Sequence, residues 1–293
     1  LHVIVIDPDA KKVDALRRRM TEAGLYGGRI AAHVGGPATF RLPPYMAGLV
    51  IVDGTAASAT DRTRLLGAVF HVLRPYGGVA CLGLGAEALK QMVREANLPG
   101  ATVKAADTST SLLVREGPLP GAADWTHEYA DAANTVVSQD ERVKAPLGLL
   151  WFGGPSNDEI LPRHGHGPAP QVAAGRLVIE GRDMLRALDI YTGRLLWQKE
   201  LGGLGAFYDN TSHQPGAGEI GSNYVTLPDA VYVVYGERIL QLDAATGRQT
   251  RAFTLDESAG GAEPNWGFVA ACDELLIVAA TPIAVEGSAG APP

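Results

Sequence analysis

The hydrophobic and polar positions follow one pattern in the first half of the chain and another in the second. In the first half, fully apolar runs such as residues 2–6 alternate with segments such as residues 10–22, whose apolar side chains recur every three to four positions. Apolar runs are typical of strands covered on both faces, and the longer period is typical of amphipathic helices. We therefore predict an α/β doubly wound, parallel sheet for residues 1–116. The predicted strands are 2–6, 29–34, 48–53, 78–83, 102–105 and 111–114, and the predicted helices are 10–22, 61–73 (capped by Thr60 or Asp61) and 86–97.

The second half consists of short β-rich runs that precede a repeated phrase. Residues 175–180 and 230–235 are such runs, and each is followed by Leu-Asp-x-x-Thr-Gly, with the two copies 54 residues apart. A fixed-period repeat of strands indicates stacked β units that bury their faces against each other. The repeat residues are Leu188, Asp189, Thr192, Gly193 and, in the second copy, Leu242, Asp243, Thr246 and Gly247.

The repeated phrase has a mechanical interpretation. Each leucine ends a strand, each aspartate is placed to accept backbone N–H groups in the next turn, and Thr-Gly supplies a hydroxyl and a residue with positive φ. Trp197 follows the first copy, whereas Phe253 stands near the corresponding position of the second. The phrase resembles the PQQ-like (quinoprotein-type) β-propeller repeat, A-L-D-x-x-T-G-x-x-x-W. The resemblance implies that Trp197 docks between neighbouring blades, and that the second blade docks less tightly or uses Phe253.

Residues 151–293 have room for only two to three such blades, the third beginning at Trp266. A closed propeller needs about four to eight blades. The first residue, Leu1, already enters an apolar run. We therefore expect an internal fragment of a larger bacterial protein with an incomplete ring.

Residues 117–150 connect the two patterns. Gly117-Pro118-Leu119-Pro120-Gly121 has the composition of a linker. The phrase that follows, with Trp125, Asp131 and Thr135, resembles the entry segment that precedes the first blade of quinoprotein-like propellers. Trp125 and Trp151 are predicted to be core anchors.

Within residues 1–116, the order of elements resembles class I S-adenosylmethionine-dependent methyltransferases. The resemblance is carried by Val5-Ile6-Asp7-Pro8-Asp9, His33-Val34-Gly35-Gly36, Leu49-Val50-Ile51-Val52-Asp53 and the turn Leu73-Arg74-Pro75-Tyr76-Gly77-Gly78. A nicotinamide-binding fold would share Asp7 but not that turn. The family's first strand and its glycine-rich loop would precede Leu1.

The resemblance implies a cofactor site for S-adenosylmethionine at Asp7, Val34, Gly35, Gly36 and Asp53. Asp7 would hold the ribose, residues 34–36 would border the adenine, and Asp53 lies where substrate-orienting residues often fall. Two alternatives stay open, because Asp7 also suits a helix cap and Asp53-Gly54 an ordinary turn. Gly36 replaces the acidic residue common at its position. No catalytic residue is identified.

Composition and charge exclude several classes. The net charge of −7 without a Lys/Arg run argues against nucleic acid binding. Cys81 and Cys272 fit neither a disulfide framework nor haem attachment, and both are predicted to be small buried residues. No apolar run has membrane-spanning length.

His164 and His166 form an H-x-H phrase that, with His213, offers three nitrogen ligands for a metal. The favoured interpretation is a neutral polar pocket at the propeller mouth, with no metal. PQQ itself is not expected, since two or three blades do not enclose a cofactor and there is no Cys-Cys pair.

Two hypotheses for the function follow. The first is an S-adenosylmethionine-dependent methyltransferase-like protein whose propeller recognises or scaffolds an unknown small-molecule or protein acceptor. The second is a non-catalytic, exported PQQ-like propeller that binds or scaffolds and carries a vestigial nucleotide-fold domain; a quinoprotein oxidoreductase is a lesser alternative. An exported or periplasmic location is slightly favoured over the cytoplasm.

Overall fold

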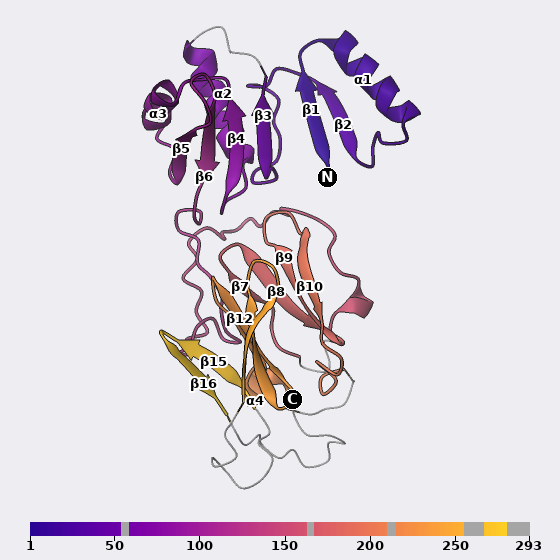
Figure 1. Cartoon of the computed structure of the whole chain (residues 1–293), viewed down its shortest axis with the longest axis vertical. Helices are drawn as coiled ribbons and strands as arrows, with labels where there is room; N and C mark the ends of the chain where they lie inside the picture. Colours follow the sequence, from indigo (N-terminus) through magenta and orange to yellow (C-terminus); the bar gives the residue numbers. More distant parts are fainter. Residues whose placement is uncertain (54–58, 163–166, 210–214, 255–266, 280–293) are drawn as a thin grey trace. The chain divides into compact units, whose positions relative to one another are not determined.

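The chain divides into two compact units, Leu1–Gly117 and Pro118–Pro293. The computed structural model describes residues 1–53, 59–162, 167–209, 215–254 and 267–279. The first unit alternates strands and helices, and the second is built from antiparallel strands (Figure 1).

The first unit contains three helices and six strands in the described residues, close to the predicted ranges. Helix α2 begins at Ala59, so Thr60 and Asp61 lie in its first turn and not before it as predicted. The elements are β1 (Val3–Asp7), α1 (Ala10–Glu22), β2 (Ile30–Val34), β3 (Leu49–Val52), α2 (Ala59–Val72), β4 (Gly78–Leu82), α3 (Ala86–Glu95), β5 (Ala101–Ala105) and β6 (Ser111–Arg115).

The strands of the first unit form a mixed sheet in two pieces. Strands β1 and β2 are parallel, and the second piece has the order β3-β4-β6-β5, in which β3 and β4 are parallel. The prediction of an all-parallel sheet is wrong for β6, which is antiparallel to both β4 and β5. The reason is the short β5–β6 connection, in which Asp107 accepts the Ser109 and Thr110 N–H groups. A parallel crossover would need a dozen or more residues.

One face of β3 is packed and the other is open. Val50 and Val52 pack with Leu66 of α2 and Leu89 of α3 in the core of this unit. Side chains alternate between the faces of a strand, so Leu49 and Ile51 lie on the opposite face. These two side chains are 62% and 71% exposed.

The predicted turn before β4 is tight. Tyr76 and Gly77 have φ angles of 57° and 108°, and the Gly78 N–H donates to the Arg74 carbonyl at 2.9 Å. A Cβ atom at Gly78 would lie 2.5 Å from that carbonyl oxygen, so the position requires glycine. Buried Arg115 donates to the Phe70 carbonyl at 2.8 Å, which ties β6 to the last turn of α2.

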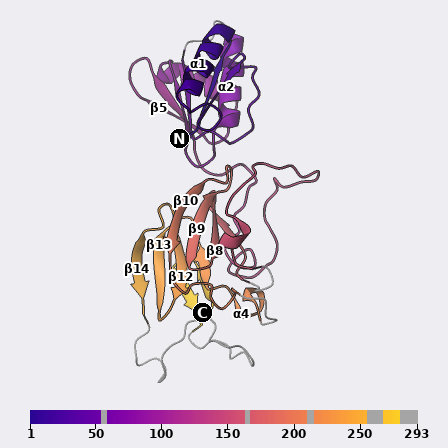
Figure 2. The ribbon, with the colours of Figure 1, turned by 90° about the vertical axis from the view of Figure 1, so that its right-hand side faces the viewer.

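Among its described residues, the second unit contains two four-stranded antiparallel sheets and a two-stranded one, which we call blade one, blade two and the β15–β16 pair. The two blades are stacked side by side (Figure 2). Blade one consists of β7 (Gln171–Ala173), β8 (Arg176–Gly181), β9 (Met184–Asp189) and β10 (Leu195–Glu200). Blade two consists of β11 (Tyr224–Thr226), β12 (Ala230–Tyr235), β13 (Arg238–Asp243) and β14 (Gln249–Phe253), and the pair of β15 (Val269–Cys272) and β16 (Leu275–Val278). Two short helices, η1 (Asn157–Glu159) and α4 (Ala217–Ile220), lie in the connections.

The repeated phrase forms the turn between the third and fourth strands of each blade. Asp189 Oδ1 accepts the Tyr191 and Thr192 N–H groups at 3.0 and 3.1 Å. In blade two, Asp243 Oδ1 accepts the Thr246 N–H at 2.9 Å. The glycines that end both phrases have φ angles of 66° and 68°.

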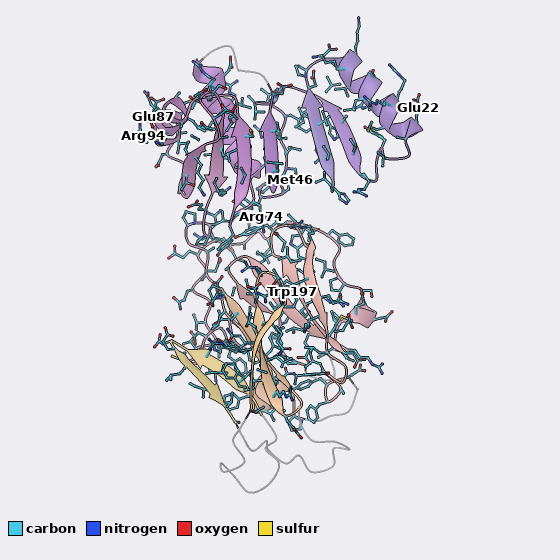
Figure 3. All side chains as sticks on the ribbon, viewed as in Figure 1. Glu22, Met46, Arg74, Glu87, Arg94 and Trp197 are labelled. Carbon is cyan, nitrogen blue, oxygen red and sulfur yellow. The ribbon has the colours of Figure 1, made fainter. Side chains whose placement is uncertain are left out.

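Trp197 joins the two blades. Its Nε1 donates to the Ala244 carbonyl at 2.9 Å, and its ring lies against Gly247, where a Cβ atom would be only 2.6 Å from the ring. The side chain is part of a core cluster drawn from both blades, among them Val178 and Val231 (Figure 3). A side chain larger than glycine at position 247 would displace the indole.

Phe253 packs on the other side of blade two. Its ring centroid lies 6.3 Å from that of Tyr232, and it packs with Val269 and Ala271 of β15. The β15–β16 pair falls where a third blade is predicted, but Trp266 lies outside the described residues.

The entry segment contacts the first strand of each sheet in turn. Trp125 exchanges two backbone hydrogen bonds with Val172 of β7, at 2.8 and 2.7 Å. The Thr126 carbonyl accepts the Thr226 N–H of β11 at 3.2 Å. His127 Nε2 accepts the Ala271 N–H of β15 at 3.1 Å. The segment therefore connects β7, β11 and β15, one strand from each sheet that the described part of this unit contains.

The cysteine prediction is half wrong. Cys81 on β4 is partly buried, but Cys272 at the end of β15 is exposed. Cys272 is the last residue of a strand and precedes a tight turn at Asp273, which has a φ angle of 51°. A strand end beside a turn offers no second layer to bury the thiol.

Candidate functional site

Asp7 stands at the carboxyl end of β1. Its Oδ1 accepts the Asp9 N–H at 2.7 Å, and its Oδ2 lies 4.0 Å from Lys12 Nζ. The cap of α1 is Asp9, whose Oδ1 accepts the Lys11 N–H at 2.8 Å. The cap interpretation therefore applies to Asp9, and Asp7 keeps a partly exposed carboxylate at the strand end.

Val34 and Gly35 lie beside Asp7. Val34 is the register partner of Asp7, and the Gly35 N–H donates to the Asp7 carbonyl at 3.1 Å. The Phe40 ring covers Gly35, where a Cβ atom would lie 2.7 Å from Phe40 Cδ2, and it contacts His33 at 5.2 Å between ring centroids. Phe40 adds an aromatic surface that the sequence analysis did not identify, because it lies outside every regular element.

Gly36 begins the turn that brings Phe40 back. Its carbonyl accepts the Thr39 and Phe40 N–H groups at 3.0 and 2.8 Å. Asp53 directly follows β3 and is exposed, and residues 54–58 after it lie outside the described part. Asp7 is the last residue of β1, which pairs in parallel with β2, and Asp53 directly follows β3, which pairs in parallel with β4. Ligands of open α/β sheets bind beyond the carboxyl ends of such strands.

The residues at this strand end fit part of an adenosyl group. The Asp7 carboxylate has lone pairs free for ribose hydroxyls, and Phe40 offers a face for a base. Gly36 offers no carboxylate to the adenine amino group.

The three histidines of the metal hypothesis, His164, His166 and His213, lie outside the described residues. Within the described residues, no group of three or more His, Cys, Asp or Glu side chains is arranged to hold a metal ion. The structure therefore adds nothing to the histidine pattern.

A buried polar cluster lies at one end of the blades. Glu180 is the last residue but one of β8 and is 2% exposed, Tyr208 lies in the β10–β11 connection, and Asn223 precedes β11. Among the described residues, none of these three polar groups has a hydrogen-bond partner of good geometry. Buried polar groups normally have partners, so this cluster is an exception of the kind found at functional sites.

Burial also shifts the titration of this cluster. Desolvation raises the pKa of Glu180 to about 8, and nearby Asn223 partly offsets this. Desolvation likewise raises the pKa of Tyr208, with a smaller contribution from the Glu180 charge. Glu180 is therefore largely protonated at neutral pH. The sequence alone does not single out Glu180, because this residue occupies an ordinary position in a strand.

A second carboxyl group lies in the entry segment. Glu128 Oε2 accepts the Ala169 N–H at 2.9 Å, and burial raises the pKa of Glu128. The Ala169 carbonyl accepts the Tyr224 hydroxyl at 2.7 Å. The backbone of Ala169 thus links Glu128 of the entry segment to Tyr224 of β11, near the buried cluster of Glu180.

No family model and no curated protein match the chain. Among solved structures, the chain is similar to BamB from Moraxella catarrhalis, at 19% identity over 36% of this chain and 27% of that one, with a TM-score of 0.24. It is also similar to the quinohemoprotein alcohol dehydrogenase from Comamonas testosteroni, at 18% identity over 53% and 23%, with a TM-score of 0.36.

A third similar structure is a SAM-dependent methyltransferase from Aquifex aeolicus, at 12% identity over 39% of this chain and 67% of that one, with a TM-score of 0.30. Both classes that the sequence resembles are therefore present among the similar structures. The chain spans only about a quarter of the two propeller proteins. At these identities, ligand and activity are not transferred, and the functional argument rests on the chain's own residues. In the described part, no helix has the length and apolarity to cross a membrane.

Proposed function

We propose that the chain belongs to a longer S-adenosylmethionine-binding, methyltransferase-like protein, in which the propeller recognises or scaffolds the acceptor. The observation that carries the proposal is the position of Asp7, at the carboxyl end of β1 and beside Val34 and Gly35. A carboxylate at this strand end is suited to the two ribose hydroxyls of an adenosine-containing ligand.

The strand order supports this assignment. Doubly wound nucleotide-binding sheets have the order 3-2-1-4-5-6, with the ligand at the switch point beside strand 1. The pieces β2-β1 and β3-β4-β6-β5 follow this order, with position 1 left open among the described residues and with the antiparallel β6 inserted between positions 5 and 6. In Figure 1, β1 is the strand of its pair that lies nearer to β3. In the proposed protein, a further strand fills this position, and its loop holds the methionine end of the cofactor.

The open face of β3 also supports a further strand, together with the helix that would connect it to β1. In a right-handed crossover, the helix between the added strand and β1 lies on the same face as α1. By the same rule α2, between β3 and β4, lies on the opposite face. The α1 side of β3 is therefore the side of Leu49 and Ile51, whose exposure such a helix would remove.

Calorimetric titration with S-adenosylhomocysteine tests the proposal on the full-length protein that contains these residues. We expect binding that Asp7→Asn weakens at least about tenfold, since hydrogen bonds to a charged group contribute about 1.5–3 kcal/mol. Asp14→Asn is the matched control, because Asp14 is an exposed carboxylate of α1 that pairs with Arg17. No heat at ligand concentrations far above micromolar, or a preference for NAD, would contradict the proposal.

A non-catalytic, exported scaffold protein is the second candidate. Gly36 favours it, because this position lacks the carboxylate that would accept the adenine amino group. In this case the propeller carries the function, and the first unit binds no adenosyl ligand. Binding of S-adenosylhomocysteine that depends on Asp7 would exclude this candidate.

A further inference from the structure

Residues 148–153, which we call the Trp151 segment, repeat part of β10 in sequence. Gly148-Leu149-Leu150-Trp151 corresponds to Arg194-Leu195-Leu196-Trp197. Trp197 belongs to the fourth strand of blade one, directly after the Leu-Asp-x-x-Thr-Gly turn. No such turn precedes Trp151 in the sequence, so the segment has the end of a blade without its beginning.

Trp151 contacts blade one in the way that Trp197 contacts blade two. Trp151 Nε1 donates to the Ile190 carbonyl at 2.8 Å, and Trp197 Nε1 donates to the Ala244 carbonyl at 2.9 Å. Each acceptor is the residue after the aspartate of the repeated phrase. Each indole ring also lies against the glycine that ends the same phrase, Gly193 for Trp151 and Gly247 for Trp197.

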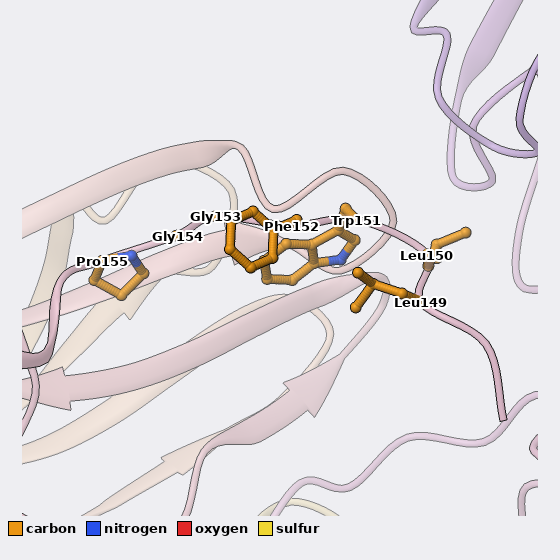
Figure 4. Close-up of a pocket in the computed structure, with 7 residues that line it drawn as sticks. All are labelled: Leu149, Leu150, Trp151, Phe152, Gly153, Gly154 and Pro155. Carbon is orange, nitrogen blue, oxygen red and sulfur yellow. The ribbon is translucent and has the colours of Figure 1, made fainter.

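The two tryptophans differ in what surrounds them on their own strand. Leu195 pairs with Leu188 of β9 and is half exposed. Among the described residues no strand pairs with the Trp151 segment, and Leu149 and Phe152 are 79% and 93% exposed. Figure 4 shows these side chains around an open pocket formed by the segment itself. Isolated exposed leucines are common, but apolar side chains exposed on both sides of a docked tryptophan indicate an interaction site.

We propose that the Trp151 segment is the fourth strand of a further propeller blade, which docks on blade one through Trp151. Its partner is an antiparallel strand with the chemistry of β9, apolar at alternate positions and ending in Leu-Asp-x-x-Thr-Gly. Trp151 repeats the contact that Trp197 makes, and Trp197 belongs to β10, a strand that pairs with β9. This repetition argues that the Trp151 segment also pairs with a strand like β9. Since the tryptophan contact fixes which blades are neighbours, the further blade lies on the side of blade one opposite to blade two.

An insertion in the 293-residue chain tests this inference independently of cofactor binding. A second copy of residues 169–193 is placed between Leu147 and Gly148, so that its turn leads directly into the Trp151 segment. Residue 147 lies in an exposed connection, where insertions are tolerated best. The tether also gives the copy a high effective concentration at the segment.

The measurement is amide hydrogen exchange followed by mass spectrometry. We expect exchange at residues 149–152 to slow at least about tenfold relative to the unmodified chain, together with protection of the inserted copy. A scrambled copy of identical composition is the matched control and is expected to give no protection. Adding Trp151→Ala to the native-order insertion is expected to remove the gain.

Two results would overturn the proposal. One is a native-order insert that exchanges as fast as the scrambled insert. The other is loss of protection from exchange in blade one itself, because the proposal predicts that strands inserted between residues 147 and 148 leave the fold of blade one intact.

Discussion

The two units bury their apolar strands to different extents. In the second unit, the core between blade one and blade two takes side chains from both sheets, with Trp197 crossing from one to the other. In the first unit, α2 and α3 pack on one face of β3 and β4, while Ile51 on the other face remains exposed. A repeat finds its packing partner in the next copy along the chain, whereas a doubly wound sheet needs elements on both faces.

The largest expected effect is at the blade interface. Trp197→Ala removes a buried indole and its hydrogen bond to Ala244, and should lower the free energy of unfolding of the second unit by about 3–5 kcal/mol. Urea titration followed by hydrogen exchange in β12 measures this value. Trp151→Ala is the comparison variant, and its expected effect is smaller because the Trp151 side chain is only partly buried, whereas that of Trp197 is buried. Equal losses would mean that the Trp151 segment is already fully packed.

The next effect compares the two faces of the first sheet. Leu66→Ala in the packed core should cost about 2–4 kcal/mol, and Ile51→Ala should change the free energy of unfolding by less than about 0.5 kcal/mol. Urea unfolding of both variants, followed by hydrogen exchange in β4, measures the difference. A large cost for Ile51→Ala would show that this face is covered in solution.

Glu180 should make the free energy of unfolding of the second unit depend on pH. Because the pKa is about 8 in the fold and ordinary in the unfolded chain, the folded state holds the proton more tightly. Its contribution to stability is present below about pH 4.5 and is lost as pH rises through 8. Between pH 6 and 8 the loss should be about 2 kcal/mol.

Glu180→Gln should flatten this slope, since glutamine keeps the shape without titrating. Chemical denaturation at several pH values provides the test. A wild-type slope that survives in Glu180→Gln would assign the dependence to another group.

The smallest expected effect has the opposite sign. Burial lowers the pKa of His127, and its Nε2 accepts the Ala271 N–H only when it is unprotonated. Its contribution is therefore complete above the unfolded pKa of about 6.5 and falls as pH drops toward the lowered folded value. His127→Gln should remove this dependence between pH 7 and 5, as measured by the thermal midpoint of the second unit. An unchanged profile would show that the contact to β15 does not depend on the imidazole.

Much of the fold follows from local sequence. The period of apolar residues in 10–22 predicts α1 to the residue, and the Leu-Asp-x-x-Thr-Gly phrases predict the blade turns because their hydrogen bonds are made within a few residues. The antiparallel insertion of β6 is not local. It depends on which strands pair, and the apolar pattern of residues 111–114 does not indicate whether the strand runs parallel or antiparallel to its neighbours.

The candidate sites divide in the same way. Asp7 is predicted from its place at the end of an apolar run. It lies beside Val34 because β1 and β2 pair in parallel. Glu180 and Phe40 are not predicted. Glu180 becomes unusual only when Tyr208 and Asn223, more than twenty residues away in sequence, bury it. Phe40 reaches Gly35 through an irregular turn with no sequence period.

Amide hydrogen exchange across the unmodified chain tests the central comparison most directly. Strands β1 and β3 each have one partner among the described residues, so amides on their other edge lack a strand acceptor. The account predicts that exchange in residues 49–52 is at least about a hundredfold faster than in residues 230–235 of β12, which pairs on both sides. Equal protection of β3 and β12 would contradict it, because the open edge and face of the first sheet would then be covered in solution.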